Sequence, residues 1–236
     1  DSNLVNGKPI IYLVNVSDKT VDSSTDAGLV YCLNCDNITV KGLNLTDNFF
    51  GIAFQKTTRS RIEGNLLIGN EDGIRLNGSV NNTISGNRID DNDRGISLDR
   101  SEGCAIEANE IRHNRGAVSL INSSQIAVLG NLVEENSGDG IHLENSRNNT
   151  VSENAVAHNE AGIVLDRSIQ NTLSDNNVSG NDKGIRLNES GANELDANLM
   201  TGNGCNFAVE GQNHSDLRND IDSSNMLNNI LSHTVL

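Results

Sequence analysis

The chain has 236 residues, of which 35% are hydrophobic and 3% aromatic, and it carries a formal net charge of -15. A charge of that sign argues against nucleic acid or an anionic membrane surface as a partner. No apolar run reaches the roughly 18 residues that cross a bilayer, so no direct membrane insertion is predicted.

Residues 1–27 do not follow the pattern of the rest of the chain. Residues 8–14 are predicted to form a strand, with a turn at 18–20 and a return strand over 20–22. We expect them to form a hairpin or extra layer, an N-terminal cap over the unpaired edge of the first coil. Because the chain begins at Asp1 without Met or a signal peptide, it is expected to be a mature or excised segment of a longer precursor.

Residues 28–227 are built from a repeat of 22 residues. The segment 73–94, GIRLNGSVNNTISGNRIDDNDR, returns with the same pattern from residues 95, 140 and 162. Self-similarity at such a period marks a repeat architecture. Each unit holds three short apolar groups between Gly, Asn, Asp and Ser, which predicts three short strands. The predicted fold is all-β, a right-handed single-stranded parallel β-helix of about nine coils, where one coil is one repeat.

Apolar residues recur at four positions of the repeat and predict the core. Equivalent side chains of successive coils should stack about 4.8 Å apart, the spacing of neighbouring strands. The four predicted columns run from Ile52 to Phe207, from Phe54 to Val209, from Val40 to Leu217 and from Leu45 to Met200.

Asparagine occupies two further positions of the repeat, at predicted turns. Asn tolerates the left-handed backbone of a sharp turn, and stacked amides can bond to one another along the rod. One asparagine ladder is predicted from Asn65 to Asn198 and the other from Asn48 to Asn225. The spacing lengthens once, to 23 residues, at Ser137-Gly138-Asp139, where the turn is expected to bulge.

The repeat decays near Asp220 and Asp222, which stand where Asn and an apolar residue are expected. Terminal repeats of solenoids are usually atypical. Residues 228–236 are predicted to be a C-terminal cap. The apolar residues expected to fold over the last coil are Met226, Leu227, Ile230 and Leu231.

The pattern GIxLxxSxxNxIxxNxIxxN resembles the parallel β-helix (PbH1) repeats of NosD-like proteins and of sugar-binding and sugar-hydrolysing β-helix proteins. The opening GKPIIY at residues 7–12, with DAG at 26–28 and NITVKGLNL at 37–45, is similar to domains of secreted surface proteins of methanogenic archaea. The resemblance covers the whole chain and implies a β-helix outside the cell. It supplies no catalytic residue, because the repeat residues are structural.

Ten Asn-x-Ser/Thr sequons are candidates for glycosylation, which would suit an extracellular or cell-surface protein. The alternative is that most of them are unmodified turn residues. The ten sites are Asn15, Asn37, Asn44, Asn77, Asn81, Asn122, Asn148, Asn177, Asn188 and Asn213.

The four cysteines pose a question of pairing. Cys32 and Cys35 are close in sequence and are candidates for a local disulfide. Cys104 and Cys205 are about 4.6 coils apart, roughly 22 Å along the rod, which exceeds disulfide reach. Both are expected near the surface, so that either they are idle thiols or they form intermolecular disulfides in an oxidising exterior.

Outward residues of the first strand in each coil supply the candidate catalytic residues. Glu144 and Asp166 should be neighbours at about 5 Å, near the separation of a retaining glycosidase pair. His142 and Arg186 should lie close by. The alternative is a solvated acidic surface. The absence of Trp and the presence of only two Tyr and four Phe argue against a sugar-stacking platform.

Metal ligands are sparse in the sequence. A copper site, which the NosD resemblance implies, needs clustered His, Met or Cys, and the five histidines and two methionines form no such motif. No cofactor is predicted apart from structural calcium, for which Asp90, Asp91 and Asp93 are candidate ligands. Ordinary turn composition is the alternative explanation of these acids.

Two functions follow from these patterns. The first is a secreted or cell-surface structural solenoid, a self-associating envelope subunit of S-layer or sheath type without catalytic activity. The alternative is an extracellular carbohydrate-binding or polysaccharide-cleaving β-helix protein, with an extracellular polysaccharide as partner. Aromatic poverty and the lack of an acid–base motif favour the first, so we expect a protein that is not an enzyme.

Overall fold

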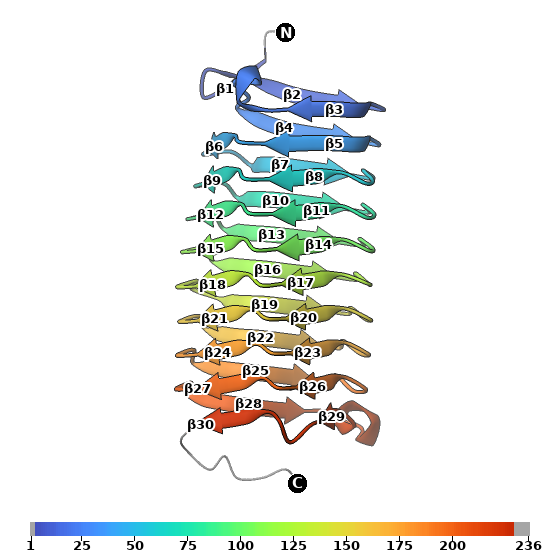
Figure 1. Ribbon diagram of the computed structural model, residues 1–236, viewed down its shortest axis with the longest axis vertical. Helices are drawn as coiled ribbons and strands as arrows, with labels where there is room; N and C mark the ends of the chain where they lie inside the picture. The colour runs from blue at the N-terminus through green and yellow to red at the C-terminus, as the bar shows by residue number, and fades with distance from the viewer. Residues whose placement is uncertain (1–2, 229–236) are drawn as a thin grey trace.

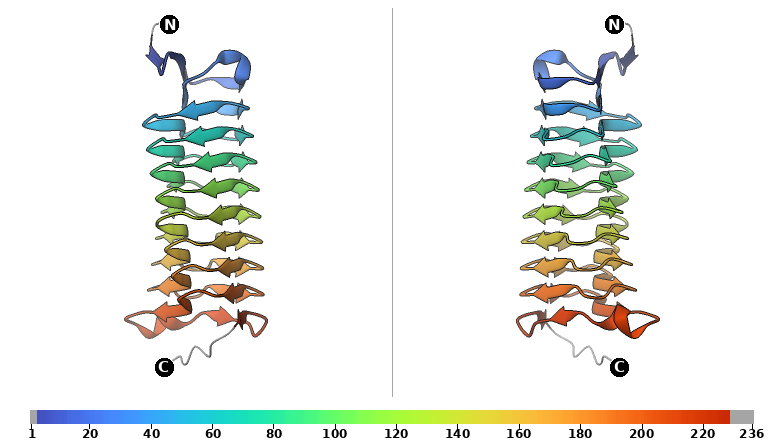
Figure 2. Two further views of the ribbon diagram at one scale, coloured as in Figure 1. Left: turned by 90° about the vertical axis from the view of Figure 1, so that its left-hand side faces the viewer. Right: turned by 90° about the vertical axis from the view of Figure 1, so that its right-hand side faces the viewer.

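Each coil after the first contributes one strand to each of three sheets that run along a rod, as the computed structural model of the protein shows for residues 3–228 (Figure 1). The first and last described strands, β1 (Leu4–Val5) and β30 (Met226–Asn228), lie at opposite ends of the rod (Figure 2). All strand pairs between successive coils are parallel. The predicted fold, a right-handed parallel β-helix, is confirmed, with about ten coils.

The first sheet has eleven strands, and the site described below lies on its outer face. Its strands are β1 (Leu4–Val5), β2 (Lys8–Val14), β4 (Leu29–Leu33), β7 (Phe50–Gln55), β10 (Asp72–Asn77), β13 (Arg94–Asp99), β16 (Gly116–Ile121), β19 (Asp139–Glu144), β22 (Ala161–Asp166), β25 (Lys183–Asn188) and β28 (Cys205–Glu210).

The second and third sheets have ten and nine strands, most of them three residues long. The second contains β3 (Ser17–Val21), β5 (Asp36–Lys41), β8 (Arg61–Glu63), β11 (Thr83–Ser85), β14 (Ala105–Glu107), β17 (Ala127–Leu129), β20 (Thr150–Ser152), β23 (Thr172–Ser174), β26 (Glu194–Asp196) and β29 (Asp220–Ile221). The third contains β6 (Asn44–Thr46), β9 (Leu66–Ile68), β12 (Arg88–Asp90), β15 (Glu110–Arg112), β18 (Leu132–Glu134), β21 (Ala155–Ala157), β24 (Asn177–Ser179), β27 (Leu199–Thr201) and β30 (Met226–Asn228).

Two short 3-10 helices, η1 (Ser23–Thr25) and η2 (His214–Leu217), lie near the ends of the rod. Within residues 3–228, neither they nor any other helix has the length and apolar character needed to cross a membrane.

The four apolar columns form the core of the rod. Ile74, for example, is in register with Ile52 and Ile96 and is fully buried. The third column differs from the prediction at its end. Leu217 lies in η2 and is exposed, and Ile221 takes the place opposite Leu195. The reason is that the chain between β28 and β29 leaves the 22-residue pattern.

The asparagine ladders hold the turns of successive coils together. In the first ladder the Asn87 Oδ1 accepts from the backbone N–H of Asn65 at 2.9 Å and from its Nδ2 at 3.0 Å. The Nδ2 of Asn87 donates to the carbonyl of Ile62 at 2.9 Å. Asn225 belongs to this ladder and not to the second, because its Oδ1 accepts from Asn198 Nδ2 at 2.9 Å.

The N-terminal segment differs from the predicted hairpin. Strand β2 pairs in parallel with β4, and β3 pairs in parallel with β5, so that residues 8–27 form a first coil. Leu13 and Val21 point inward and are buried, as in the coils that follow. Burial of these two side chains on the next coil explains why β2 and β3 do not pair with each other. The antiparallel pair at this end is β1 with β2.

At the C-terminal end, β30 pairs with β27 and extends the third sheet. Its Met226 and Leu227 are exposed, so they do not cover the last coil within the described part of the chain. Residues 229–236 of the predicted cap, with Ile230 and Leu231, lie outside the described residues.

The cysteines are free thiols, and three of the four are buried. The Cys35 Sγ donates to the carbonyl of Leu13 at 3.5 Å, so the predicted disulfide between Cys32 and Cys35 is absent. The expectation that Cys104 lies near the surface is wrong. Its Sγ accepts from the backbone N–H of Asn82 at 3.4 Å, which places it inside the rod. Cys205 alone is exposed among them.

The core assignment predicts the effect of an Ile106→Asp substitution. The side chain of Ile106 is completely buried, and it lies in register between Ile84 and Val128 of the neighbouring coils. An unpaired carboxylate there should destabilise the fold by several kcal/mol. We expect an unfolded or aggregated protein by circular dichroism, whereas Ala105→Asp, one residue away and partly exposed, should fold. A folded Ile106→Asp protein with unchanged melting would contradict this assignment.

Candidate functional site

One column of outward side chains runs along the first sheet from end to end. Because alternate residues of a strand point to the same face, equivalent positions of successive strands lie side by side. The members in order along the rod are Tyr12, Tyr31, Ala53, Arg75, Ser97, Ser119, His142, Val164, Arg186 and Ala208. We call this set the outward column.

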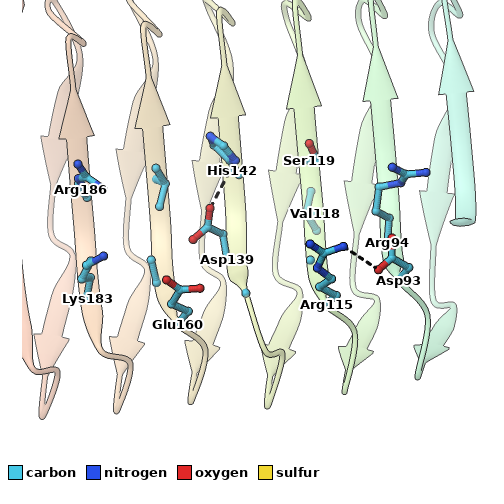
Figure 3. Close-up of a pocket in the computed structure, with 14 residues that line it drawn as sticks. Asp93, Arg94, Arg115, Val118, Ser119, Asp139, His142, Glu160, Lys183 and Arg186 are labelled. Carbon is cyan, nitrogen blue, oxygen red and sulfur yellow. Dashed lines mark hydrogen bonds and ion pairs between the residues drawn. The ribbon is translucent and has the colours of Figure 1, made fainter. Parts of the chain in front are cut away.

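A cavity of about 510 Å³ lies over strands β13 to β25, centred on the outward column. Figure 3 shows the side chains around it. We call it the cationic groove and define it by the residues that carry charge or can exchange a proton there. These are Asp93, Arg94, Arg115, Asp139, His142, Glu160, Lys183 and Arg186.

The charge balance of the groove differs from that of the chain. The whole sequence has 17 basic and 32 acidic residues, whereas the groove has four basic and three acidic side chains. Arg115 pairs with Asp93 at 3.3 Å, and Arg186 pairs with Glu210 at 2.8 Å. Arg94 is held by Asp72 and by Glu71. The pairs with Asp93, Glu210 and Glu71 are exposed or partly exposed and contribute little to stability, whereas the carboxylate of Asp72 is buried.

His142 and Asp139 form the pair at the centre of the groove. His142 Nδ1 lies 3.4 Å from an oxygen of Asp139, as the dashed line in Figure 3 indicates. Within the described residues, the buried His142 Nε2 has no hydrogen-bond partner, and neither has the buried Nε of Arg186. Unpartnered buried polar atoms are costly and mark places where a ligand or water bonds. A histidine whose Nδ1 faces a carboxylate keeps Nε2 available as a proton acceptor.

The predicted bulge at Ser137-Gly138-Asp139 positions Asp139. Pairing between β16 and β19 begins at Val118 with Ile141, while β19 pairs with β22 from Asp139 onward. A Cβ at residue 138 would lie 2.3 Å from the carbonyl oxygen of Arg115, so glycine is required there. Bulges of this kind commonly re-aim a side chain beside a functional site.

The pKa of the Asp139 carboxyl is raised above its ordinary value. Burial is the main cause, because it disfavours the charged form, and the charge of Glu160 adds to it. The positive charges of His142, Lys183 and Arg186 act in the opposite direction. A carboxyl with a raised pKa beside a histidine is an arrangement suited to proton transfer.

The structure divides the four predicted catalytic candidates into two pairs. His142 and Arg186 line the groove. Glu144 and Asp166 are side by side in the sheet, as predicted, but lie at the far ends of their strands. Arg167 contacts both, at 3.0 Å and 3.2 Å respectively. An arginine between two carboxylates makes them a surface ion-pair cluster.

The three candidate calcium ligands are not gathered around one point. Asp90 contacts Arg88 at 3.1 Å and His113 at 2.8 Å, whereas Asp93 contacts Arg115. His113 also contacts Glu135 at 2.9 Å, and the hydrogen bond that its ring donates to Asp90 is the main cause of its raised pKa. Among residues 3–228 no group of three or more His, Cys, Asp or Glu side chains is arranged to hold a metal ion. Bound calcium stays a prediction.

The ten sequon asparagines all lie on the outside of the rod. Eight are exposed, and the other two, Asn77 and Asn188, are partly exposed. These two donate to Asp99 and Asp166 respectively. The sequons therefore fall on different positions from the buried ladder asparagines, and glycosylation stays a prediction.

Sequence reasoning missed Asp139, Arg115 and Lys183 as members of the site. The change in spacing from 22 to 23 residues was a signal for Asp139, because it marked an irregular coil. Arg115 and Lys183 stand at turn and strand-start positions, where the period-two alternation does not say which way a side chain points.

The comparison with known families decides the relationship of the chain. The family model described as "Periplasmic copper-binding protein (NosD)" matches residues 5–118 and 95–234. The chain belongs to the NosD family. A search of the curated proteins found no match.

The copper in the family's description does not fit the residues of this NosD family member. Copper sites use clustered His, Met or Cys, and the described residues contain no such cluster. The neighbouring thiols of Cys32 and Cys35 are buried, and burial raises the pKa of Cys32 far above its ordinary value. The thiolate, which is the form that binds metal, is therefore disfavoured.

Solved structures share the fold of this chain at low identity. The periplasmic alginate epimerase AlgG matches with a TM-score of 0.73 and 15% identity, over 92% of this chain and 73% of that one. The Azotobacter vinelandii mannuronan C-5 epimerase AlgE4 A-module has a TM-score of 0.69 and 15% identity, over 94% and 74% of the two chains. Pectate lyase Pel9A has a TM-score of 0.64 and 12% identity, over 93% and 69%.

These likenesses correct the expectation that the chain is not an enzyme. The similar structures are two epimerases and a lyase, so the same coil architecture carries catalysis in each of them. They favour the alternative prediction, a protein that binds or cleaves polysaccharide, over a non-catalytic envelope subunit. At such identities they show the shared fold alone.

The raised pKa of Asp139 predicts that replacing this residue increases the thermal stability of the protein, by an amount that depends on pH. A carboxyl whose pKa is higher in the folded state stabilises the fold at low pH, and that contribution is lost as the pH rises through the folded-state pKa. Asp139→Asn should therefore raise the midpoint of thermal unfolding at pH 7. The gain should shrink below about pH 4, where the unfolded carboxyl is also protonated.

The matched control is Asp175→Asn, an exposed acid on the turn after β23. It should shift the midpoint little at either pH. A lower midpoint for Asp139→Asn at pH 7, or an equal gain at both pH values, would contradict the assignment of Asp139 as a partly buried, destabilising acid.

Proposed function

We propose that the protein is an extracytoplasmic enzyme that binds an acidic polysaccharide along the first sheet and transforms it at His142. The observation that carries the proposal is the cationic groove, in which basic side chains surround a histidine–carboxylate pair on an otherwise acidic protein. The family's description names the periplasm, which supports a location outside the cytoplasm.

The positive groove supports an anionic ligand. Its basic side chains outnumber its acidic ones by four to three, and a local excess of one sign of charge raises the concentration of ligands of the opposite sign. Arginine is well suited to carboxylates because its planar guanidinium makes two parallel hydrogen bonds. Alginate, mannuronan and pectate, which appear in the names of the similar structures, are polymers of uronic acids with a carboxylate on each sugar.

The shape of the sheet surface supports a long ligand. Further cavities lie on the outward column on both sides of the groove. Small side chains at Ala53, Ser97 and Ser119 leave room between the larger members of the column. A polymer parallel to the rod axis would contact successive coils through equivalent positions.

The chemistry that fits these residues is proton abstraction from the sugar carbon next to the carboxylate. His142 Nε2 would accept the proton, and Asp139 would orient the ring through Nδ1. Arg115, Lys183 and Arg186 would neutralise the negative charge that develops on the carboxylate. Delivery of a proton from water to the opposite face of the carbanion would give the epimer. Cleavage would instead break the bond between the neighbouring carbon and the glycosidic oxygen, which would take the proton from His142 Nε2 and leave an unsaturated product.

Binding is tested with the double variant Arg115→Gln/Lys183→Gln. Arg115 is highly exposed and Lys183 is also exposed, so the fold should be retained. We expect affinity for polygalacturonate or alginate to fall at least about tenfold, and wild-type binding to weaken with added salt. The charge-matched control is Lys41→Gln/Lys56→Gln, on exposed positions outside the groove. An equal loss in both double variants would point to net charge and against the groove.

Turnover is tested with His142→Gln. This variant removes the proton acceptor and should lower the rate of epimerisation, followed by NMR, or of cleavage, followed by ultraviolet absorbance of unsaturated ends, by about 100-fold or more. Binding of the polymer should change little. Undiminished turnover in His142→Gln would exclude His142 as the base, and turnover absent from the wild-type protein on both polymers would reject the enzymatic part of the proposal.

A further inference from the structure

Most aromatic residues of the chain gather at one place on the surface. The sequence has two Tyr, four Phe and no Trp. Four of these six, Tyr12, Tyr31, Phe49 and Phe50, lie on or beside β2, β4 and β7 at the N-terminal end of the first sheet (Figure 1). We call this set the aromatic platform. The chain is therefore poor in aromatic residues overall, but the few it has are concentrated at one end of one sheet.

The rings of the platform contact one another in a row. The centroids of Tyr12 and Tyr31 are 5.4 Å apart, and those of Tyr31 and Phe50 are 6.4 Å apart. Phe49 meets Phe50 edge-on at 4.5 Å. The Tyr31 hydroxyl donates to Gln55 at 2.5 Å, and the Arg75 guanidinium lies 5.5 Å from the Phe50 ring centre. These contacts hold the inner rings in place and leave the outer ones free.

The outer rings are unusually exposed for their type. Tyr12 is 58% exposed and Phe49 is 60% exposed. Cross-strand aromatic pairs stabilise a sheet surface, but that role is met by the inner pair and does not need two further open ring faces. An open cluster of aromatic rings on a soluble protein commonly marks a binding surface.

The platform is continuous with the cationic groove along the outward column. A cavity of about 240 Å³ is lined by Tyr31, Phe50, Ala53 and Arg75. The next, of about 360 Å³, is lined by Arg75, Ser97 and Ser119. Ser119 also lines the groove. From Tyr31 to His142 there are five strand spacings, or about 24 Å.

We propose that the aromatic platform is a distal subsite for the same acidic polysaccharide. The apolar faces of sugar rings would pack against Tyr12 and against Phe49, which lie at the two ends of the row, and Arg75 would bind the carboxylate of a following unit. This inference rests on the proposed function, because the groove supplies the direction in which the polymer runs. It deepens that function by making the ligand a chain of several uronic acid units that extends past His142 to the N-terminal coil.

The length of the ligand is the distinguishing consequence. A disaccharide cannot reach from the groove to a platform about 24 Å away, so it should bind without regard to the platform. A polymer contacts both subsites at once, and the two contacts add to its affinity. Loss of the platform should therefore lower the affinity of the protein for the polymer and leave its affinity for the disaccharide unchanged.

Tyrosine fluorescence reports on the platform directly, because the chain has no Trp and its only two tyrosines belong to the platform. We would titrate the full chain with polygalacturonate, alginate and digalacturonate. The polymer that binds should change the tyrosine emission, whereas digalacturonate should not. Tyr12→Ala and Phe49→Ala should each lower affinity for the polymer about fivefold. Both residues are exposed, so unchanged melting is expected.

The matched control is Ile169→Ala, which truncates an exposed apolar side chain outside the outward column. It should leave polymer affinity unchanged. If the polymer binds in a groove-dependent way while tyrosine emission and both platform variants are unaffected, the distal subsite is rejected and the proposed function stands. If emission changes and binding survives Arg115→Gln/Lys183→Gln, the platform stands and the groove assignment falls. Absence of binding to both polymers would overturn the two together.

Discussion

The stacked amides at the turns are the interaction on which the rest of the structure depends. Within the ladders an asparagine such as Asn109 accepts from the coil before it, through both the backbone N–H and the amide of Asn87, and its own Nδ2 donates to a backbone carbonyl. This satisfies turn groups that would otherwise be buried without partners. Because the amides of successive coils bond in fixed positions, a coil cannot slip in register. The outward side chains therefore form straight columns, and a ligand site can extend over many coils.

The one irregular coil shows how such a scaffold accommodates function. The extra residue at Gly138 falls between the asparagine ladder and the first sheet. The ladder continues across it, since Asn136 Nδ2 donates to Asn159 Oδ1 at 2.9 Å despite the longer spacing. Only the start of β19 is displaced, and Asp139 is brought to His142. The destabilising burial of a carboxyl at this place is typical of a site where stability is exchanged for function.

The surface charges of the rod also differ between the groove and the remaining coils. Most arginines are neutralised by acids of their own or the next coil, as Arg112 is by Glu134 at 2.6 Å. The three arginines of the groove are paired with acids as well, whereas Lys183 has no ion-pair partner within the described part of the chain. An acidic protein can thus attract an acidic polymer at one place, because screening confines charge effects to about 10 Å at moderate salt.

The sequence by itself determined the coil architecture, its core and its turn ladders. Ile74, Ile84 and Asn87 recur every 22 residues, and a one-dimensional repeat leaves one way to stack them. Pairing of β2 with β4 was decided by the tertiary structure. It depends on burial of Leu13 against the next coil, and the 22-residue repeat does not relate these two segments. The tertiary structure also decided the position of Cys104. Its side chain belongs to an inward-facing ladder, which the spacing of the sequence did not reveal.

The site needed the tertiary structure for a related reason. The period-two pattern placed His142 and Arg186 on the outer face, because strand residues alternate. Arg115, Asp139 and Lys183 lie at turns and strand ends, where direction depends on backbone conformation and on the bulge. Tyr12 and Tyr31 are separated by 19 residues rather than 22, so only their pairing in the sheet brings their rings together. Composition determined how few aromatic residues there are, and the fold decided that they lie side by side.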